Sequence, residues 1–354
     1  MVVLHIASIK GNMSSGVCVI VPQHVKYQAE RVTAGLVNIQ NVEVPGVVQL
    51  KYEGAENFPA YLPEPFNKPD LVVFHEVNCF EYIHIYKKLK KAHIAYIIFP
   101  HGSLTKQALK KKWLKKKIAY TLFFNAFIKN AAAIQTLSQN ECDNIKFKVK
   151  KFIGTNGVRL PEKNKQKFSS EGIKFVYIGR LDAYVKGLDL MLEAISKTSA
   201  LLRENKCEFK LYGPDLNGRF QHVLDLIKEN NVSDLVTLSR EIYGKDKEEA
   251  LLDADIFIQT SRTEGMPLGI LEALSYGIPC LVTQGTSLGE VISGNNAGWA
   301  AQTSADGISK ALVEAIGDKP KYKIKSENAK KLIEAEFQWD KIVAKTLEDY
   351  QKYV

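Results

Sequence analysis

The stretch Ile256–Thr283, which reads IFIQTSRTEGMPLGILEALSYGIPCLVT, decides the fold of this chain. It begins with an apolar, β-branched run, Ile256–Gln259, and ends with a second apolar run, Ile278–Val282. A polar turn and a segment with helical periodicity lie between the two runs. Two apolar strands that are joined by a helix form the βαβ unit of a parallel sheet. The stretch therefore predicts an α/β protein.

Two carboxylates lie on either side of the predicted helix start. Glu264 and Glu272 stand eight positions apart, and Pro267 between them suits the first helical position. Glu264 is then expected just before the helix and Glu272 about one turn inside it. A helix start also leaves free N–H groups that can hold an anion, here those of Gly265, Met266 and Leu268. Such a loop suits a ligand with both phosphate and hydroxyl groups, and a sugar nucleotide has both.

The segments Glu264–Pro267 and Leu271–Ala273 together resemble a family signature, Glu, seven residues, Glu. It is the signature of the retaining glycosyltransferases of family 4, which have the GT-B fold. The resemblance implies an α/β chain with two doubly wound Rossmann-like domains that face each other across a cleft. It also implies that Glu264 lies near the transferred sugar and that the donor is bound by Gly265, Met266, Pro267, Leu268 and Glu272. The alternative is a solvated helix start whose glutamate compensates the helix dipole.

The composition is that of an ordinary globular protein. The chain has 354 residues, 45% of them hydrophobic and 25% charged, and its length suggests about two domains. Its five cysteines are scattered and odd in number, which argues against a disulfide framework and a structural zinc site and fits a reducing cytoplasm. We find neither a signal-peptide pattern nor an apolar run of about 18 residues, so we expect a protein that is neither secreted nor integral to a membrane.

Positive charge is concentrated in the first half of the chain. Residues 1–163 contain 23 Lys and Arg against 11 Asp and Glu, whereas the remainder contains 25 against 28. This half is expected to meet an anionic partner such as a phospholipid surface, a lipid-linked diphosphate or a nucleic acid. The lysines are densest from Lys106 to Lys117, where Trp113 and Leu114 lie among them. We interpret this segment as a helix that docks on an anionic membrane; the alternative is a merely solvated lysine-rich helix.

Ligand-binding positions in the first half are expected after its strands. Val17–Val21 reads as a strand by pattern, and Pro22 argues against a helix interior. The resemblance instead places the first helix there, with Gly16 closing a glycine-containing loop that faces the donor diphosphate. His75 and His101 each follow a β-rich run, where open α/β sheets bind ligands. The resemblance implies that His101 contacts the transferred sugar, whereas His75 is interpreted as structural.

A pair of basic residues follows the first strand of the second half. Gly179-Arg180 and, a few residues later, Lys186-Gly187 resemble the family's pair of cations that hold the donor diphosphate. Cations in a dry site stabilise the charge that develops on a leaving diphosphate; the alternative is an exposed basic loop. Gly213 ends the next strand, near the nucleotide in the family. Arg240 stands where the family usually has a glycine.

Asp253 and Asp255 raise the question of a metal site. Their spacing is that of the carboxylate pair that binds Mn²⁺ or Mg²⁺ in the other large glycosyltransferase fold. Both precede the strand that starts at Ile256, so they are expected at its amino end, opposite the ligand edge. We therefore predict no metal and no cofactor.

These observations give one hypothesis for the whole chain. Residues 1–163 form an acceptor-side Rossmann-like domain, residues 164–336 bind the nucleotide sugar, and residues 337–354 form a helix that crosses back to the first domain. The predicted activity is metal-independent, retaining transfer of a sugar to an acceptor hydroxyl, with the leaving phosphate oxygen taking the acceptor proton. The expected acceptor is a lipid-linked saccharide of capsule, O-antigen or exopolysaccharide assembly, and the expected location is the cytoplasmic face of the membrane.

Other functions remain compatible with the fold. Some epimerases and phosphorylases share it, but we see neither their additional acid/base carboxylates nor a lysine signature for pyridoxal phosphate. A protein that binds nucleic acid through the basic half would show an affinity that falls steeply with salt, and no affinity for nucleotide sugars. The sequence leaves UDP, GDP and TDP sugars equally open.

Overall fold

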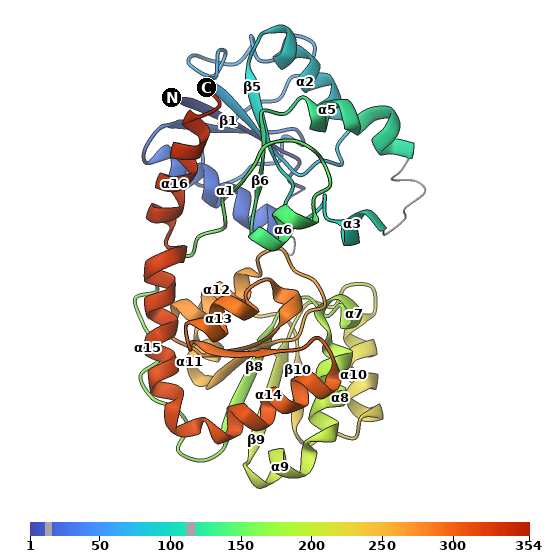
Figure 1. Cartoon of the computed structure of the whole chain (residues 1–354), viewed down its shortest axis with the longest axis vertical. Coiled ribbons are helices and arrows are strands. Elements are labelled where there is room, and N and C mark those ends of the chain that lie inside the picture. The colour runs from blue at the N-terminus through green and yellow to red at the C-terminus, as the bar shows by residue number, and fades with distance from the viewer. Residues whose placement is uncertain (11–15, 111–117) are drawn as a thin grey trace. The chain divides into compact units, whose positions relative to one another are not determined.

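The computed structural model describes residues 1–10, 16–110 and 118–354 (Figure 1). The chain divides into two compact units, one formed by Met1–Asn156 with Trp339–Val354 and the other by Gly157–Gln338. The loop before Gly16 and most of the lysine-rich segment, residues 111–117, lie outside the described residues.

The first unit is built on a parallel sheet of seven strands in the order β3-β2-β1-β4-β5-β6-β7. The strands are β1 (Val2–Ala7), β2 (Thr33–Asn38), β3 (Gln49–Leu50), β4 (Leu71–His75), β5 (Ala95–Phe99), β6 (Ala133–Thr136) and β7 (Lys151–Ile153). Its helices are α1 (Gly16–Ala29), α2 (Glu81–Lys91), α3 (Lys106–Lys110), η1 (Tyr120–Phe124), α5 (Asn125–Lys129), α6 (Gln139–Asn144) and α16 (Trp339–Gln351). The strand order reverses between β1 and β4, and such a switch point is where open α/β sheets bind ligands.

Helix α1 corrects one prediction from the sequence. Residues Val17–Val21 are helical, not extended, and Pro22 lies inside the helix. A proline inside a helix costs about 3 kcal/mol because it removes one hydrogen bond. Burial of one face outweighs that cost, since Ile20, Val21 and Val25 are all buried. The helix predicted from the resemblance is therefore confirmed, and the strand predicted from the local pattern is wrong.

The second unit contains a parallel sheet of six strands in the order β10-β9-β8-β11-β12-β13. The strands are β8 (Ile173–Ile178), β9 (Cys207–Tyr212), β10 (Val236–Ser239), β11 (Ile256–Gln259), β12 (Cys280–Thr283) and β13 (Gly298–Ala301). The helices are α7 (Ala183–Lys186), α8 (Leu188–Lys197), α9 (Ser199–Glu204), α10 (Arg219–Glu229), α11 (Gly244–Asp253), α12 (Leu268–Ser275), η2 (Gln284–Thr286), α13 (Gly289–Gly294), α14 (Ala305–Gly317), η3 (Lys319–Lys321), α15 (Tyr322–Leu332) and η4 (Ile333–Phe337). Its switch point lies between β8 and β11.

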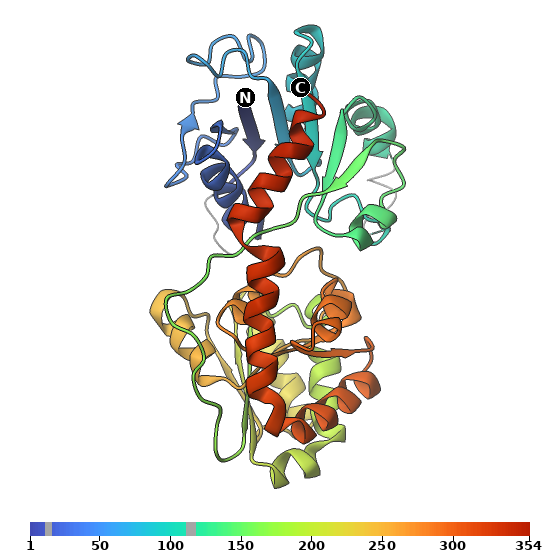
Figure 2. The same ribbon diagram turned by 60° about the vertical axis from the view of Figure 1, so that its left-hand side comes forward.

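Helices cover both faces of the second sheet. Buried side chains of α8, α10 and α14 form one core layer with the sheet, and those of α11, α12, α13 and α15 form the other. Figure 2 shows α15 in front of this sheet, and α15 packs on α12. Two covered faces explain why the segment Ile256–Gln259 is apolar at nearly every position, because both sides of its strand are buried.

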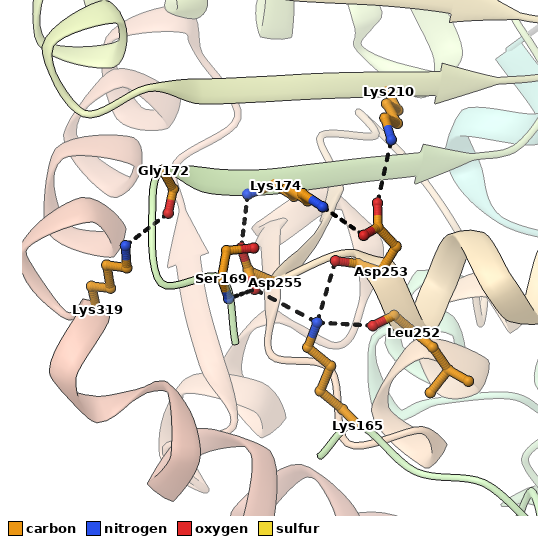
Figure 3. A network of polar contacts seen from close by, with 9 residues as sticks. All are labelled: Lys165, Ser169, Gly172, Lys174, Lys210, Leu252, Asp253, Asp255 and Lys319. Atoms are coloured by element: carbon orange, nitrogen blue, oxygen red, sulfur yellow. Dashed lines mark hydrogen bonds and ion pairs between the residues drawn. The ribbon is translucent and has the colours of Figure 1, made fainter. Parts of the chain in front are cut away.

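A network of charged groups joins the amino ends of β8 and β11 (Figure 3). The buried Asp255 carboxylate accepts hydrogen bonds from the backbone N–H groups of Ser169 (2.8 Å) and Lys174 (2.9 Å), and lies 3.6 Å from the Lys165 ammonium. Asp253 instead pairs with the ammonium groups of Lys174 (2.6 Å) and Lys210 (3.3 Å). The two carboxylates are thus held by lysines and backbone donors at the end of the sheet opposite the switch-point loops.

We expect Asp255→Ala to destabilise the second unit by about 3–5 kcal/mol, because it leaves the buried Lys165 ammonium without its charged partner and the N–H groups of Ser169 and Lys174 without their acceptor. Asp253→Ala is the matched control, two residues away, and should cost less than about 1 kcal/mol because its carboxylate is 43% exposed. Urea unfolding followed by circular dichroism measures both. Equal losses for the two variants would contradict this account of the network.

Candidate active site

Glu264 lies in the loop between β11 and α12, at the carboxyl end of the central strand. Its carboxylate forms an ion pair with the Lys186 ammonium and accepts a hydrogen bond from Ser261 Oγ (3.1 Å). The Glu264 N–H donates to the Gly285 carbonyl (2.8 Å), and Ser287 Oγ donates to the Glu264 carbonyl (2.8 Å). The side chains of Lys186 and Glu264 are only 12% and 16% exposed. The loop therefore holds a carboxylate and a cation together in a largely shielded place.

The start of α12 differs from the prediction by one residue. Pro267 is the residue before the helix, with extended backbone angles (φ −76°, ψ 109°), and the helix begins at Leu268. The N–H groups of Gly265 and Met266 donate no hydrogen bond to any residue that the structure describes. They remain available to an anion, as the sequence predicts.

Glu272 lies on α12 and forms an ion pair with Lys247 of α11. The two side chains are 31% and 27% exposed, so both remain accessible to a ligand. Sequence reasoning singled out Glu272 but missed Lys247, because no motif marks that lysine and only the packing of α11 beside α12 brings them together. Helix α12 thus carries the carboxylate of a second ion pair, and the loop that precedes α12 carries the carboxylate of the first.

The loop after β8 carries the predicted pair of cations. The Gly179 N–H donates to the Tyr212 carbonyl (3.0 Å), and the buried Tyr177 hydroxyl donates to the Arg180 carbonyl (2.7 Å). Burial raises the pKa of Tyr177, and the nearby Glu264 carboxylate raises it further, so the hydroxyl stays a donor. The Arg180 guanidinium makes no hydrogen bond or ion pair with a described residue, whereas Lys186 is paired with Glu264.

At two positions on the carboxyl edge of the second sheet, another backbone segment lies too close for any residue but glycine. A Cβ at Gly213 would lie 2.2 Å from the Gly179 carbonyl oxygen, so the ends of β8 and β9 can meet only without a side chain there. Gly187 has a φ of +64°, and a Cβ on it would lie 2.0 Å from the Thr260 carbonyl oxygen. This second contact fixes the end of α7, and with it Lys186, against the end of β11.

Arg240 stands where the family that this sequence resembles usually has a glycine. Its guanidinium lies 2.9 Å from the Asp215 carboxylate and 4.3 Å from the centre of the Phe220 ring. The ion pair holds the pKa of Asp215 below its usual range. The arginine is thus anchored on the loop that follows Gly213.

Two of the predicted site residues belong to the first unit. Gly16 is the exposed first residue of α1. His101 follows β5 in a left-handed conformation (φ 49°) and stacks on Phe99, with ring centroids 3.9 Å apart. His101 Nε2 lies 2.9 Å from Nδ1 of His75, which sequence reasoning interpreted as structural. His75 is therefore in direct contact with the predicted sugar-binding histidine.

Comparison with known families connects this geometry to a chemistry. The family described as glycosyl transferases group 1 matches residues 158–332, which span nearly the whole second unit. The second unit is thus similar to group 1 glycosyltransferases. It contains Arg180, Lys186, Glu264 and Glu272, and the match supports glycosyltransferase activity. An uncharacterized glycosyltransferase of Methanocaldococcus jannaschii is 26% identical over 271 residues, which cover 74% of this chain and 70% of that protein.

Solved structures extend the likeness to both units. Sucrose-phosphate synthase of Thermosynechococcus elongatus has a TM-score of 0.75 at 15% identity, over 99% of each chain. Anabaena HepE, solved with UDP and glucose, has a TM-score of 0.74 at 13% identity, over 99% of this chain and all of that one. At such identities the likeness shows the fold, and the chain has the two-domain GT-B fold that the sequence predicts.

We expect Gly187→Ala to destabilise the second unit more than Gly218→Ala. Both glycines have a positive φ, but a Cβ at Gly218 meets open space and costs only about 1–2 kcal/mol of backbone strain. At Gly187 the backbone strain is the same, and the added Cβ would also clash with the Thr260 carbonyl. Thermal unfolding of the two variants measures the difference, and equal melting temperatures would contradict the close approach.

Proposed function

We propose that this protein is a retaining, metal-independent glycosyltransferase that moves a sugar from a nucleotide diphosphate to an acceptor hydroxyl. The observation that carries the proposal is the Lys186–Glu264 pair, which lies beside free backbone donors at the switch point of the unit that is similar to group 1 glycosyltransferases. The proposed donor is a nucleotide sugar bound by the second unit, and the proposed acceptor saccharide is bound by the first.

The charges near Glu264 suit the departure of a diphosphate. Arg180 and Lys186 supply two cations, and the N–H groups of Gly265 and Met266 supply neutral donors. When the sugar–phosphate bond breaks, negative charge builds on the phosphate oxygen, and donors already in place stabilise it without reorganising. A diphosphate would attract Lys186 and leave the Glu264 carboxylate free to accept a hydrogen bond from a hydroxyl of the sugar. The departing phosphate oxygen then takes the acceptor proton.

Glu272 has a separate role in the proposal. A carboxylate that is about one-third exposed, on the first turns of α12, can accept hydrogen bonds from the hydroxyls of a ribose. Lys247 orients that carboxylate before the donor arrives. This pair distinguishes the proposal from its rivals, because a protein that only binds nucleic acid through the first unit has no use for it. The group 1 match likewise does not favour an epimerase or a phosphorylase.

Calorimetric titration with UDP, GDP and TDP sugars tests the donor site. We expect one class to bind, and Glu272→Gln to weaken that binding about 10- to 100-fold, the value of a hydrogen bond to a charged group. Arg180→Met and Lys186→Met should lower kcat about 10²- to 10³-fold.

Lys174→Met is the control for these variants, because Lys174 lies on β8 at the opposite end of the strand and pairs with Asp253. It should retain full activity, and the wild type should keep its activity in EDTA. No binding of any nucleotide sugar would refute the proposal. Activity that returns only with Mn²⁺ would refute the metal-independent mechanism.

We further propose that the first unit docks on an anionic membrane beside a lipid-linked acceptor, at the cytoplasmic face. The described residues contain no helix that is both long and apolar enough to span a bilayer. Large apolar side chains that follow the lysine-rich segment in the sequence are nevertheless exposed: Ile118 by 54%, Leu122 by 67% and Phe123 by 45%. Phe80 is exposed by 58%. The Phe80 and Phe123 rings contact each other, with centroids 5.5 Å apart. Lysines combined with exposed apolar side chains suit an anionic lipid surface.

Replacing four lysines by glutamine should weaken binding to phosphatidylglycerol vesicles up to about a thousandfold, because each lysine near the surface contributes about 1 kcal/mol. The four are Lys111, Lys112, Lys115 and Lys116. The matched control replaces four exposed lysines of the second unit, namely Lys228, Lys245, Lys323 and Lys331. Co-sedimentation measures both variants. Equal sedimentation of the two, or equal binding to neutral lipid, would reject membrane docking, and tighter binding to RNA would favour the nucleic-acid alternative.

A further inference from the structure

Three histidines form a continuous hydrogen-bonded chain at the switch point of the first unit. His101 Nε2 lies 2.9 Å from His75 Nδ1, and His75 Nε2 lies 2.9 Å from His5 Nδ1. His5 Nε2 then lies 3.1 Å from Oε1 of Gln28 on α1. His5, His75 and Gln28 are buried, whereas His101 at the outer end is partly exposed. The histidine chain thus runs from the centre of the unit to His101, the residue that the family resemblance predicts to contact the transferred sugar.

The rings of the chain are uncharged at neutral pH. Burial lowers the pKa of His5 to about 3, and burial with the neighbouring rings lowers the pKa of His75 and His101 well below 6.5. Nearby His24 is also neutral, because burial lowers its pKa to about 4. A neutral imidazole has one N–H donor and one bare nitrogen that accepts. Each ring in the chain must therefore donate in one direction and accept from the other.

We propose that Gln28, His5 and His75 are positioning residues that fix the tautomer of His101 and leave its Nδ1 as a hydrogen-bond acceptor for a substrate hydroxyl. The carbonyl oxygen of Gln28 only accepts, so His5 carries its proton on Nε2. His5 Nδ1 is then bare and accepts from His75 Nε2–H, and His75 Nδ1 in turn accepts from His101 Nε2–H. His101 is left with a bare Nδ1, for which the described residues offer no donor.

Other contacts hold the chain in place. The Tyr82 hydroxyl donates to the His75 carbonyl (2.9 Å), and His101 stacks on Phe99. The Tyr350 hydroxyl, which donates to Gln135 (2.7 Å), also interacts with the Gln28 amide, and only the Nε2 end of that amide can donate to it, which leaves the Gln28 carbonyl for His5. A bare His101 nitrogen suits a hydroxyl, which can donate, and suits neither a carbonyl nor a phosphate oxygen. This role adds to the proposed function, and it rests on that function only for the identity of the hydroxyl that His101 binds.

Nitrogen-15 NMR of histidine-labelled protein tests the chain without any activity assay. We expect His101 in the wild type to carry its proton on Nε2, and Gln28→Met to populate both tautomers because the terminal acceptor is gone. Gln28→Glu should keep the wild-type tautomer, since a carboxylate also accepts. The matched control is Asn38→Leu, because Asn38 is equally buried in the same unit but bonds backbone groups of Ile9 and Val42 instead.

Kinetics with the donor that calorimetry identifies supplies the second readout. Gln28→Met should lower kcat about tenfold, the value of one hydrogen bond, with the donor KM unchanged and activity restored in Gln28→Glu. A wild-type His101 protonated on Nδ1, or a tautomer that Gln28→Met leaves unchanged, would overturn the inference. If NMR gives the expected tautomers but no nucleotide sugar binds, the proposed function is wrong and the inference about the three histidines is still supported.

Discussion

The candidate active-site loops of the second unit depend on one constraint, the contact between the backbones of Gly187 and Thr260. A side chain at Gly187 would overlap the Thr260 carbonyl, so the end of α7 can approach β11 only through a glycine. That approach places Lys186 within reach of Glu264, although the two are 78 residues apart in the chain. The contact converts two separate loops into one site.

Both sheets use the same physical device to make a site. In each, the strand order reverses beside the first strand, and helices leave in opposite directions from the two strands at that point. The second unit fills its switch point with charged groups and free N–H donors, which suit a diphosphate. The switch point of the first unit contains buried neutral imidazoles, which suit hydroxyls. Under the proposed function, the charged groups would hold the diphosphate and the imidazoles would hold a hydroxyl of a substrate sugar.

Charged pairs at the two ends of the second sheet have different physical roles. At the amino ends, Asp255 is almost fully buried and is neutralised by Lys165 and by backbone donors, which makes it part of the scaffold. At the carboxyl ends, Glu264 and Glu272 keep partial exposure and flexible lysine partners, so a ligand can replace either lysine. Exposure, not charge alone, separates structural carboxylates from those that can bind a substrate.

The sequence by itself determined the alternation of strands and helices, the two-domain fold and the loop around Glu264, because these depend on apolar periodicity and on residues close together in the chain. It failed at Val17–Val21, where burial of a helix face overrides β propensity and a proline. Only the tertiary structure decided the partners: Lys247 for Glu272, Lys186 for Glu264, and Gln28 and His5 for His75. These contacts join residues from different strands and helices, and no local pattern encodes a distance between elements that meet only when the sheet forms.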